Sequence, residues 1–339
     1  MSAGRPVPPN SNEYLWVAGV VRSVQKLSGT ASRWNGELYE ETRSDAGGSA
    51  MDDGGMTVNV DRVLKPVAQA YTAGRPLTED ELVNARDAVL TVVHEAKHLS
   101  NTLGDDTAPG ATPVYSPDTL ALEEGLTETW AHENVDDVIQ DIGMDRAQPG
   151  LLSAESIDSY PAYTAATDEL IRGAAEVSGL PQSQVREGLE QADRTDRWAA
   201  VADMVIDERL GDVMPAQHRE VVRTQLVQAM RPHLADVAAA QGSELQSDVA
   251  KSIAGHQSAG RAVTALSTST AGIENHYRDW HRDQAIKQAA PDPEVGHLRK
   301  FLGGQTPPDA SFRASGGDGA VPDNVRQLNS RRGQGQSLE

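Results

Sequence analysis

The sequence of 339 residues contains no cysteine. This absence excludes disulfides, thiol nucleophiles and every zinc or iron–sulfur site that uses cysteine ligands. Any metal ion must therefore be held by imidazole and carboxylate groups. Those groups are the ligands of catalytic zinc more often than of structural zinc.

Positive charge and long apolar runs are also scarce. Lys and Arg number 30 against 50 for Asp and Glu, which gives a formal net charge of −20. An acidic surface repels phosphate groups, so neither nucleic acids nor anionic membranes are expected as partners. No run approaches the ~20 apolar residues that span a bilayer, and the polar start, MSAGRPVPPNSNEY, lacks the apolar segment of a signal peptide. The sequence predicts a cytoplasmic protein, with export by a route that reads no such peptide left open.

The pattern of apolar residues predicts a mainly α fold of the α+β class. We expect a flexible leader over residues 1–12 and a single, mainly helical domain over 13–288. Residues 289–339 contain too few large apolar side chains to form a core, which predicts a disordered tail. Removing the chain after about Pro291 should leave stability unchanged for the same reason.

Only one strand is predicted, where Met56, Val58 and Val60 alternate with polar residues. The polar, glycine-rich stretch 29–55 before it is expected to be a loop. Helical spacing predicts helices over 13–27, from Thr78 to Gly104, and from Ser116 onward. Further helices are expected over 161–179, 183–192, 197–210, 216–240 and much of 243–288.

A pair of histidines lies in the second of these helices, in the pentapeptide His94-Glu95-Ala96-Lys97-His98. Residues four apart lie on one face of a helix, so both imidazoles can bind one ion at ~2.0–2.1 Å. Glu95 lies about 100° round the helix from His94. This is the H-E-x-x-H arrangement, in which the glutamate takes a proton from metal-bound water instead of binding the metal.

A catalytic zinc ion needs a third protein ligand, and the following helix offers one in LALEEGLTETWAHE. We predict Glu124 as the ligand, with Gly125 letting its helix approach the helix of His94. Glu128, one turn further on, is placed to accept the free ring N–H of a ligating histidine. Glu123 remains an alternative ligand, but it points about 100° away from Glu124, so Glu123→Ala is expected to change zinc binding least. His132 lies on the same face, either as a further support or as a solvated residue.

The pentapeptide His94–His98 followed by EEGLTE resembles the gluzincin metallopeptidases, which pair H-E-x-x-H with a glutamate on a second helix. The resemblance implies a zincin-like catalytic core with a small sheet, in which the strand at Met56–Val60 would be the edge strand that pairs with the substrate backbone. It also implies a tyrosine or histidine that donates to the oxyanion. Tyr160 and Tyr163 are the candidates, with Tyr277 and His276 as rivals.

These observations predict a zinc-dependent peptidase of a restricted peptide or protein substrate. Zn²⁺ would polarise the scissile carbonyl and lower the pKa of its water, and Glu95 would pass that water's proton to the leaving amine. One alternative is a helical structural or interaction protein, such as a phage or secretion-apparatus component with a vestigial metal site. Another is the same peptidase acting as a delivered toxin, with a delivery or assembly partner that binds the C-terminal tail.

Overall fold

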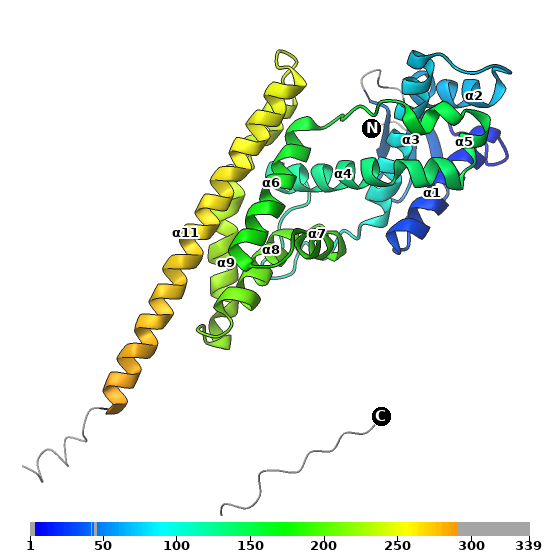
Figure 1. The fold of residues 1–339 in the computed structure, drawn as a ribbon. Coiled ribbons are helices and arrows are strands. Elements are labelled where there is room, and N and C mark those ends of the chain that lie inside the picture. The colour runs from blue at the N-terminus through cyan, green and yellow to red at the C-terminus, as the bar shows by residue number, and fades with distance from the viewer. Residues whose placement is uncertain (1–3, 42, 44–45, 290–339) are drawn as a thin grey trace, which may run out of the picture. The chain divides into compact units, whose positions relative to one another are not determined.

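The computed structural model describes residues 4–41, 43 and 46–289 (Figure 1). Residues 1–283 belong to one compact unit, and a second unit begins at Gln284. The predicted tail beyond residue 289 lies outside the described residues. Within the predicted leader, Val7 is buried and its N–H donates to the carbonyl of Leu38.

The prediction of a mainly helical chain with a small sheet is confirmed. The helices around the sheet are α1 (Asn12–Ser28), α2 (Lys65–Thr72), α3 (Glu79–Ser100), α4 (Pro117–Asp141) and α5 (Met144–Ala147). The later helices are α6 (Pro161–Ser178), α7 (Gln182–Gln191), α8 (Arg197–Val205), α9 (Arg219–Met230), α10 (Val237–Gln241) and α11 (Asp248–Ala289). No helix among the described residues combines the length and the apolar character needed to cross a membrane.

Among the described residues, the sheet has three short strands, β1 (Leu38–Glu41), β2 (Gly48–Ala50) and β3 (Met56–Asn59). Their order is β1-β3-β2, with β1 parallel and β2 antiparallel to β3. Two expectations are therefore wrong: the predicted loop contains two strands, and the predicted edge strand is the central one. The sequences of β1 (Leu-Tyr-Glu-Glu) and β2 (Gly-Ser-Ala) show no clear apolar alternation, whereas β3 buries Met56 and Val58 completely.

Helix α3 begins where the sequence predicts and ends earlier. The Thr78 side chain accepts from the N–H of Glu81, and the Glu81 side chain accepts from the N–H of Thr78. The helix ends at Ser100, four residues before the expected Gly104, because Asn101 has an extended backbone. Gly104 instead has a φ of +86° and packs directly against the Thr195 side chain.

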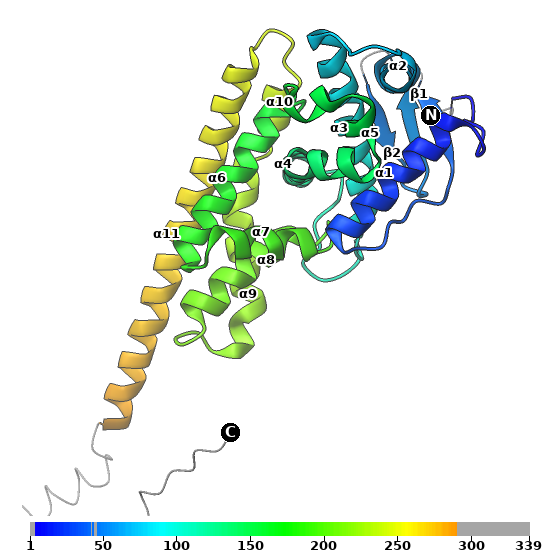
Figure 2. The same ribbon diagram turned by 45° about the vertical axis from the view of Figure 1, so that its right-hand side comes forward.

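The long helix α4 connects two hydrophobic cores. Its first half, including Leu122 and Leu126, belongs to a core shared with helices α6 to α11. Its second half, including Val135 and Val138, belongs to a core shared with α1, α2, α3 and the sheet. Figure 2 shows α4 between α3 and α6. Because it is packed on both sides, α4 holds its polar residues in a fixed orientation toward α3.

The helical prediction for the later segments is interrupted in two places. A π-helical turn, Ile206–Leu210, continues α8, and a 3₁₀ turn at Arg231–His233 separates α9 from the short α10. Pro232 in this turn lacks a backbone N–H, which favours the end of an α-helix there.

Candidate metal centre

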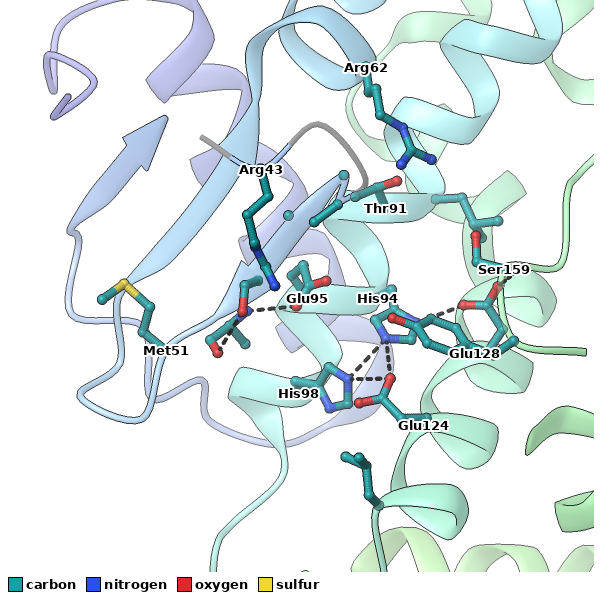
Figure 3. Close-up of a pocket in the computed structure, with 18 of the residues that line it drawn as sticks. Arg43, Met51, Arg62, Thr91, His94, Glu95, His98, Glu124, Glu128 and Ser159 are labelled. Carbon is teal, nitrogen blue, oxygen red and sulfur yellow. Dashed lines mark hydrogen bonds and ion pairs between the residues drawn. The ribbon is translucent and has the colours of Figure 1, made fainter. Parts of the chain in front are cut away.

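Three potential metal ligands meet between α3 and α4 (Figure 3). His94 Nε2 lies 2.9 Å from His98 Nε2 and 3.1 Å from Glu124 Oε2, and His98 Nε2 lies 3.4 Å from the same carboxylate oxygen. Both imidazoles are buried. The structure thus brings together the three side chains that the sequence predicted as ligands.

The outer nitrogen of each histidine is held by a second glutamate. His94 Nδ1 lies 2.7 Å from Glu128 Oε2, and His98 Nδ1 lies 2.7 Å from Glu123 Oε1. A carboxylate accepts the proton of each Nδ1, so once the Nε2 atoms lose their own protons their lone pairs are free for a metal ion. Both lone pairs therefore point into the space that Glu124 also faces.

This arrangement fits a single cation. Tetrahedral zinc with bonds of ~2.0–2.1 Å places neighbouring ligand atoms about 3.3 Å apart, close to the separations of 2.9–3.4 Å among the three side chains. Two imidazole lone pairs that face each other repel unless a proton or a metal ion lies between them. Two nitrogens and one carboxylate oxygen form the donor set of several catalytic zinc sites.

The charges of the cluster also favour a bound cation. Burial works against a charged His98, but attraction to Glu124 and the hydrogen bond that His98 donates to Glu123 raise its pKa to about 9. Burial likewise works against an ionised Glu124, but the positive charge of His98 lowers its pKa to about 2. The hydrogen bonds to Glu124 and Glu128 also overcome burial and raise the pKa of His94. The carboxylates are thus ionised and stabilise positive charge between the histidines.

Glu123 has a larger part in this cluster than the sequence indicated. It is fully buried, and its Oε1 accepts from His98 Nδ1 and, at 3.1 Å, from Asn101 Nδ2. Its Oε2 accepts from Arg197, and Arg194 Nε lies 3.3 Å from Oε1. The expectation that Glu123 matters least is therefore not supported. Glu123 binds the outer nitrogen of His98, whereas Glu124 faces the inner nitrogens of both rings. The two neighbouring glutamates therefore contact the cluster from different sides.

Gly125 has a different role from the predicted one. A Cβ at this position would lie 2.5 Å from the carbonyl oxygen of Tyr163 and would collide with the Thr167 side chain. The glycine therefore allows α4 to pack closely against α6, and it does not face α3. Helix geometry explains the difference, since Gly125 lies about 100° round α4 from Glu124.

Glu95 is buried beside the cluster and faces the edge strand β2. Its Oε2 accepts from the N–H of Ala50 at 2.7 Å, and no other hydrogen bond of its side chain occurs within the described residues. Two glycines bring β2 this close. A Cβ on Gly48 would lie 3.2 Å from Glu95 Cγ, and one on Gly47 would lie 2.8 Å from Thr91 Cγ2. The structure thus places Glu95 beside the ligands without making it one of them.

The two tyrosine candidates occupy different positions. The Tyr160 ring stacks on the His94 ring with centroids 5.1 Å apart and lines the cavity in front of the histidines. The Tyr163 ring stacks behind it at 5.9 Å and belongs to the hydrophobic core. The rival Tyr277 is held elsewhere by its 2.9 Å contact with His218 Nδ1. Only Tyr160 among these tyrosines therefore reaches the cavity.

Glu128 has further partners on the side away from the metal ligands. Its Oε1 accepts from the N–H of Ser159 at 2.9 Å and lies 3.3 Å from His132 Nε2. Glu128, His132 and Asp158 also have oxygen and nitrogen atoms close enough together to hold an ion. His132 thus lies against Glu128, one step outside the central cluster.

A cavity of about 580 Å³ opens in front of the cluster. It is bounded by the edge strand on one side and by the beginning of α6 on the other, and Glu95, Glu124 and Tyr160 all face it. Comparison with known proteins adds no relative, because no family model, curated protein or solved structure matches this chain.

Proposed function

We propose that the protein is a zinc-dependent peptidase. The observation that carries this proposal is the triad of His94, His98 and Glu124, with a buried carboxylate on the outer nitrogen of each histidine. The Glu95 carboxylate and the edge strand β2 lie beside it, on the wall of one cavity.

Zinc is the ion that suits this donor set. Imidazole and carboxylate without cysteine are typical of catalytic zinc, and a triad leaves the fourth position for water or substrate. A zinc ion held there would supply Lewis acidity that polarises a carbonyl oxygen and lowers the pKa of a water molecule. Glu123 and Glu128 keep the two histidines in the tautomer and orientation that binding requires.

Glu95 is the proposed general base. The N–H of Ala50 fixes one of its carboxylate oxygens, so the side chain is oriented before substrate arrives. In the proposed reaction this carboxylate accepts a proton from the attacking water and delivers it to the leaving amine. Tyr160, whose ring is fixed by stacking on His94, is the proposed donor to the oxyanion.

The proposed substrate is an extended peptide. Strand β2 pairs with β3 along one edge only, and all three of its residues line the cavity. No described strand pairs with its other edge, where the N–H of Ala50 donates to Glu95. An unpaired strand edge binds an extended peptide through backbone hydrogen bonds. Such pairing would place a peptide bond between Glu95 and the triad.

Glu95→Gln tests the proposal directly. The amide is nearly the same size but cannot accept the proton, so the variant should keep about one zinc ion per chain and its melting temperature while turnover falls by roughly 10²–10⁴-fold. Zinc analysis, thermal melting and cleavage of a peptide library measure the three properties. Loss of zinc on this substitution would make Glu95 a ligand and contradict the mechanism. A zinc-loaded wild-type chain that cleaves no peptide would favour a structural role for the metal.

A further inference from the structure

One end of the cavity is lined by two arginines, Arg33 and Arg194, which we call the arginine end. It lies on the His98 side of the metal centre: Arg33 Nη2 donates to the carbonyl of His98 at 3.4 Å, and Arg194 Nε lies 3.3 Å from Glu123, the residue that supports His98. Two cations beside a metal site are unexpected in a chain with a net charge of −20.

The Arg33 guanidinium has only neutral partners in the described part of the chain. It donates to the carbonyls of His98 and Asn101 at the end of α3, and to the carbonyl of Asp52, at 3.3–3.4 Å. The carboxyl end of a helix carries only about half a negative charge. Burial, and next the positive charge of Arg194, lower the pKa of Arg33. Both guanidinium groups line the same cavity, so their like charges repel each other, while the charges of Asp52 and Glu123 attract Arg33.

Arg194 is buried, and its guanidinium group lacks hydrogen-bond acceptors within the described residues. Its Nε makes no hydrogen bond, although it lies within ion-pair distance of Glu123, and its terminal nitrogens donate none within the described residues. Its backbone is nevertheless firmly held. The N–H of Arg194 donates to the carbonyl of Thr102, and the carbonyl of Thr195 accepts from the N–H of Thr112. The side chain is therefore presented to the cavity by a rigid loop.

The nearby carboxylates do not balance these charges. Glu123 is shared with Arg197 and His98, as described above, so one negative charge serves several cations. Asp52 lies at the rim of the cavity and makes no ion pair with Arg33, and its carboxylate accepts from the Tyr115 hydroxyl. An anion bound between Arg33 and Arg194 would relieve their repulsion and supply the missing acceptors.

We propose that the arginine end binds a carboxylate of the substrate, so that the site selects acidic peptides. The proposal rests on the peptidase function and names its substrate class. The carboxylate can be an Asp or Glu side chain close to the scissile bond, or the free C-terminus of the peptide. Both present two oxygens that match the planar guanidinium fork.

Peptide binding tests the proposal without any need for turnover. The zinc-loaded chain carrying Glu95→Gln is titrated with fluorescein-labelled peptides that differ only by Glu or Gln at one position. A second set has a free or an amidated C-terminus. Losing a hydrogen bond to a charged group costs roughly tenfold in affinity, so we expect one Glu→Gln change, or amidation, to weaken binding about tenfold. The set that responds identifies the source of the carboxylate.

Substitution of Arg33 distinguishes a direct contact with the peptide carboxylate from general electrostatic attraction to the chain. Arg33→Gln should abolish most of the preference, and Arg33→Glu should reverse it in favour of a Lys peptide. Arg278→Gln is the matched control, because Arg278 is exposed on α11, pairs with Glu274 and does not line the cavity. Melting temperature and zinc content identify a variant that fails to fold.

Two results would overturn the proposal. One is that the zinc-loaded Glu95→Gln chain binds the Glu and Gln peptides equally and the free and amidated peptides equally. A chain that binds none of these peptides measurably counts as the same result. The other is a preference that Arg278→Gln weakens as much as Arg33→Gln does. Selective binding without cleavage by the wild-type chain would instead contradict the peptidase function and leave the carboxylate site standing.

Discussion

The two histidines of the cluster are supported by different surroundings. His98 depends on Glu123, which is enclosed by Arg197, Arg194 and Asn101. His94 depends on Glu128, whose other contacts are the backbone N–H of Ser159 and the partly exposed His132. One support therefore lies in a buried network of full charges, and the other lies among weaker partners near the cavity.

Because of this difference, we expect Glu123 to contribute mainly to the stability of the fold and Glu128 mainly to metal affinity. Burial alone would keep Glu123 neutral, but the positive charge of Arg197 and the hydrogen bond to His98 hold its pKa well below the usual range. Removing Glu123 would leave buried cations without a partner. Removing Glu128 would leave the Nδ1–H of His94 and the backbone N–H of Ser159 unsatisfied, while the partly exposed His132 can bond to water. The His98 side should thus matter more to the fold, and the His94 side more to the metal alone.

The largest effect is expected for Glu123→Ala. Breaking a buried ion pair by removing one partner costs about 3–5 kcal/mol, so the variant should lose that much free energy of unfolding and bind zinc less tightly. Urea denaturation of the zinc-free chain measures the loss without a contribution from the metal. Glu123→Gln, which keeps the volume and one acceptor, should lose less. A change below about 1 kcal/mol for Glu123→Ala would remove the distinction between the two sides.

A smaller, metal-specific effect is expected for Glu128→Ala. Residues that orient a ligating histidine typically contribute 10–100-fold to metal affinity, and we expect a loss in that range. The zinc-free chain should be destabilised less than by Glu123→Ala. Competition with a zinc chelator gives the affinity, and urea denaturation gives the stability. Unchanged zinc affinity would show that the hydrogen bond to His94 does not set the imidazole orientation.

The smallest structural effect is expected for Tyr160→Phe. The phenyl ring can still stack on His94, so zinc content and melting temperature should stay unchanged. Loss of an oxyanion donor should lower kcat by roughly 10²-fold. Tyr163→Phe is the matched control, because that ring lies behind Tyr160 in the core, and its turnover should remain close to wild type. A larger loss for Tyr163→Phe would move the donor role away from Tyr160.

Local sequence signals predicted the parts of the structure that depend on neighbouring residues. The capping box at Thr78 sets the start of α3, and the spacing of His94 and His98 places both rings on one face. The four-residue spacing of Glu124 and Glu128 also predicted their common direction toward α3. These features depend on helix geometry, which the sequence displays directly.

Features that depend on distant segments were not predictable in the same way. The partners of Glu123 include Arg197 from a helix far along the chain, and Gly125 packs on α6 and not on α3. Strand β2 has the sequence Gly-Ser-Ala, which carries no alternation, and only its pairing with β3 defines it. Pairing and packing of this kind depend on tertiary contacts that no local pattern encodes.

The metal content of the purified chain tests the central claim most directly. Within the described part of the chain, Glu124 is the one carboxylate that faces both histidine Nε2 atoms, so its removal should destroy the site while leaving Glu123 and Glu128 in place. We predict about one zinc ion per wild-type chain and almost none in Glu124→Ala, measured by metal analysis after loading with zinc and removal of excess ion. A wild-type chain that cannot be loaded with zinc, or a Glu124→Ala variant that retains it, would contradict the account.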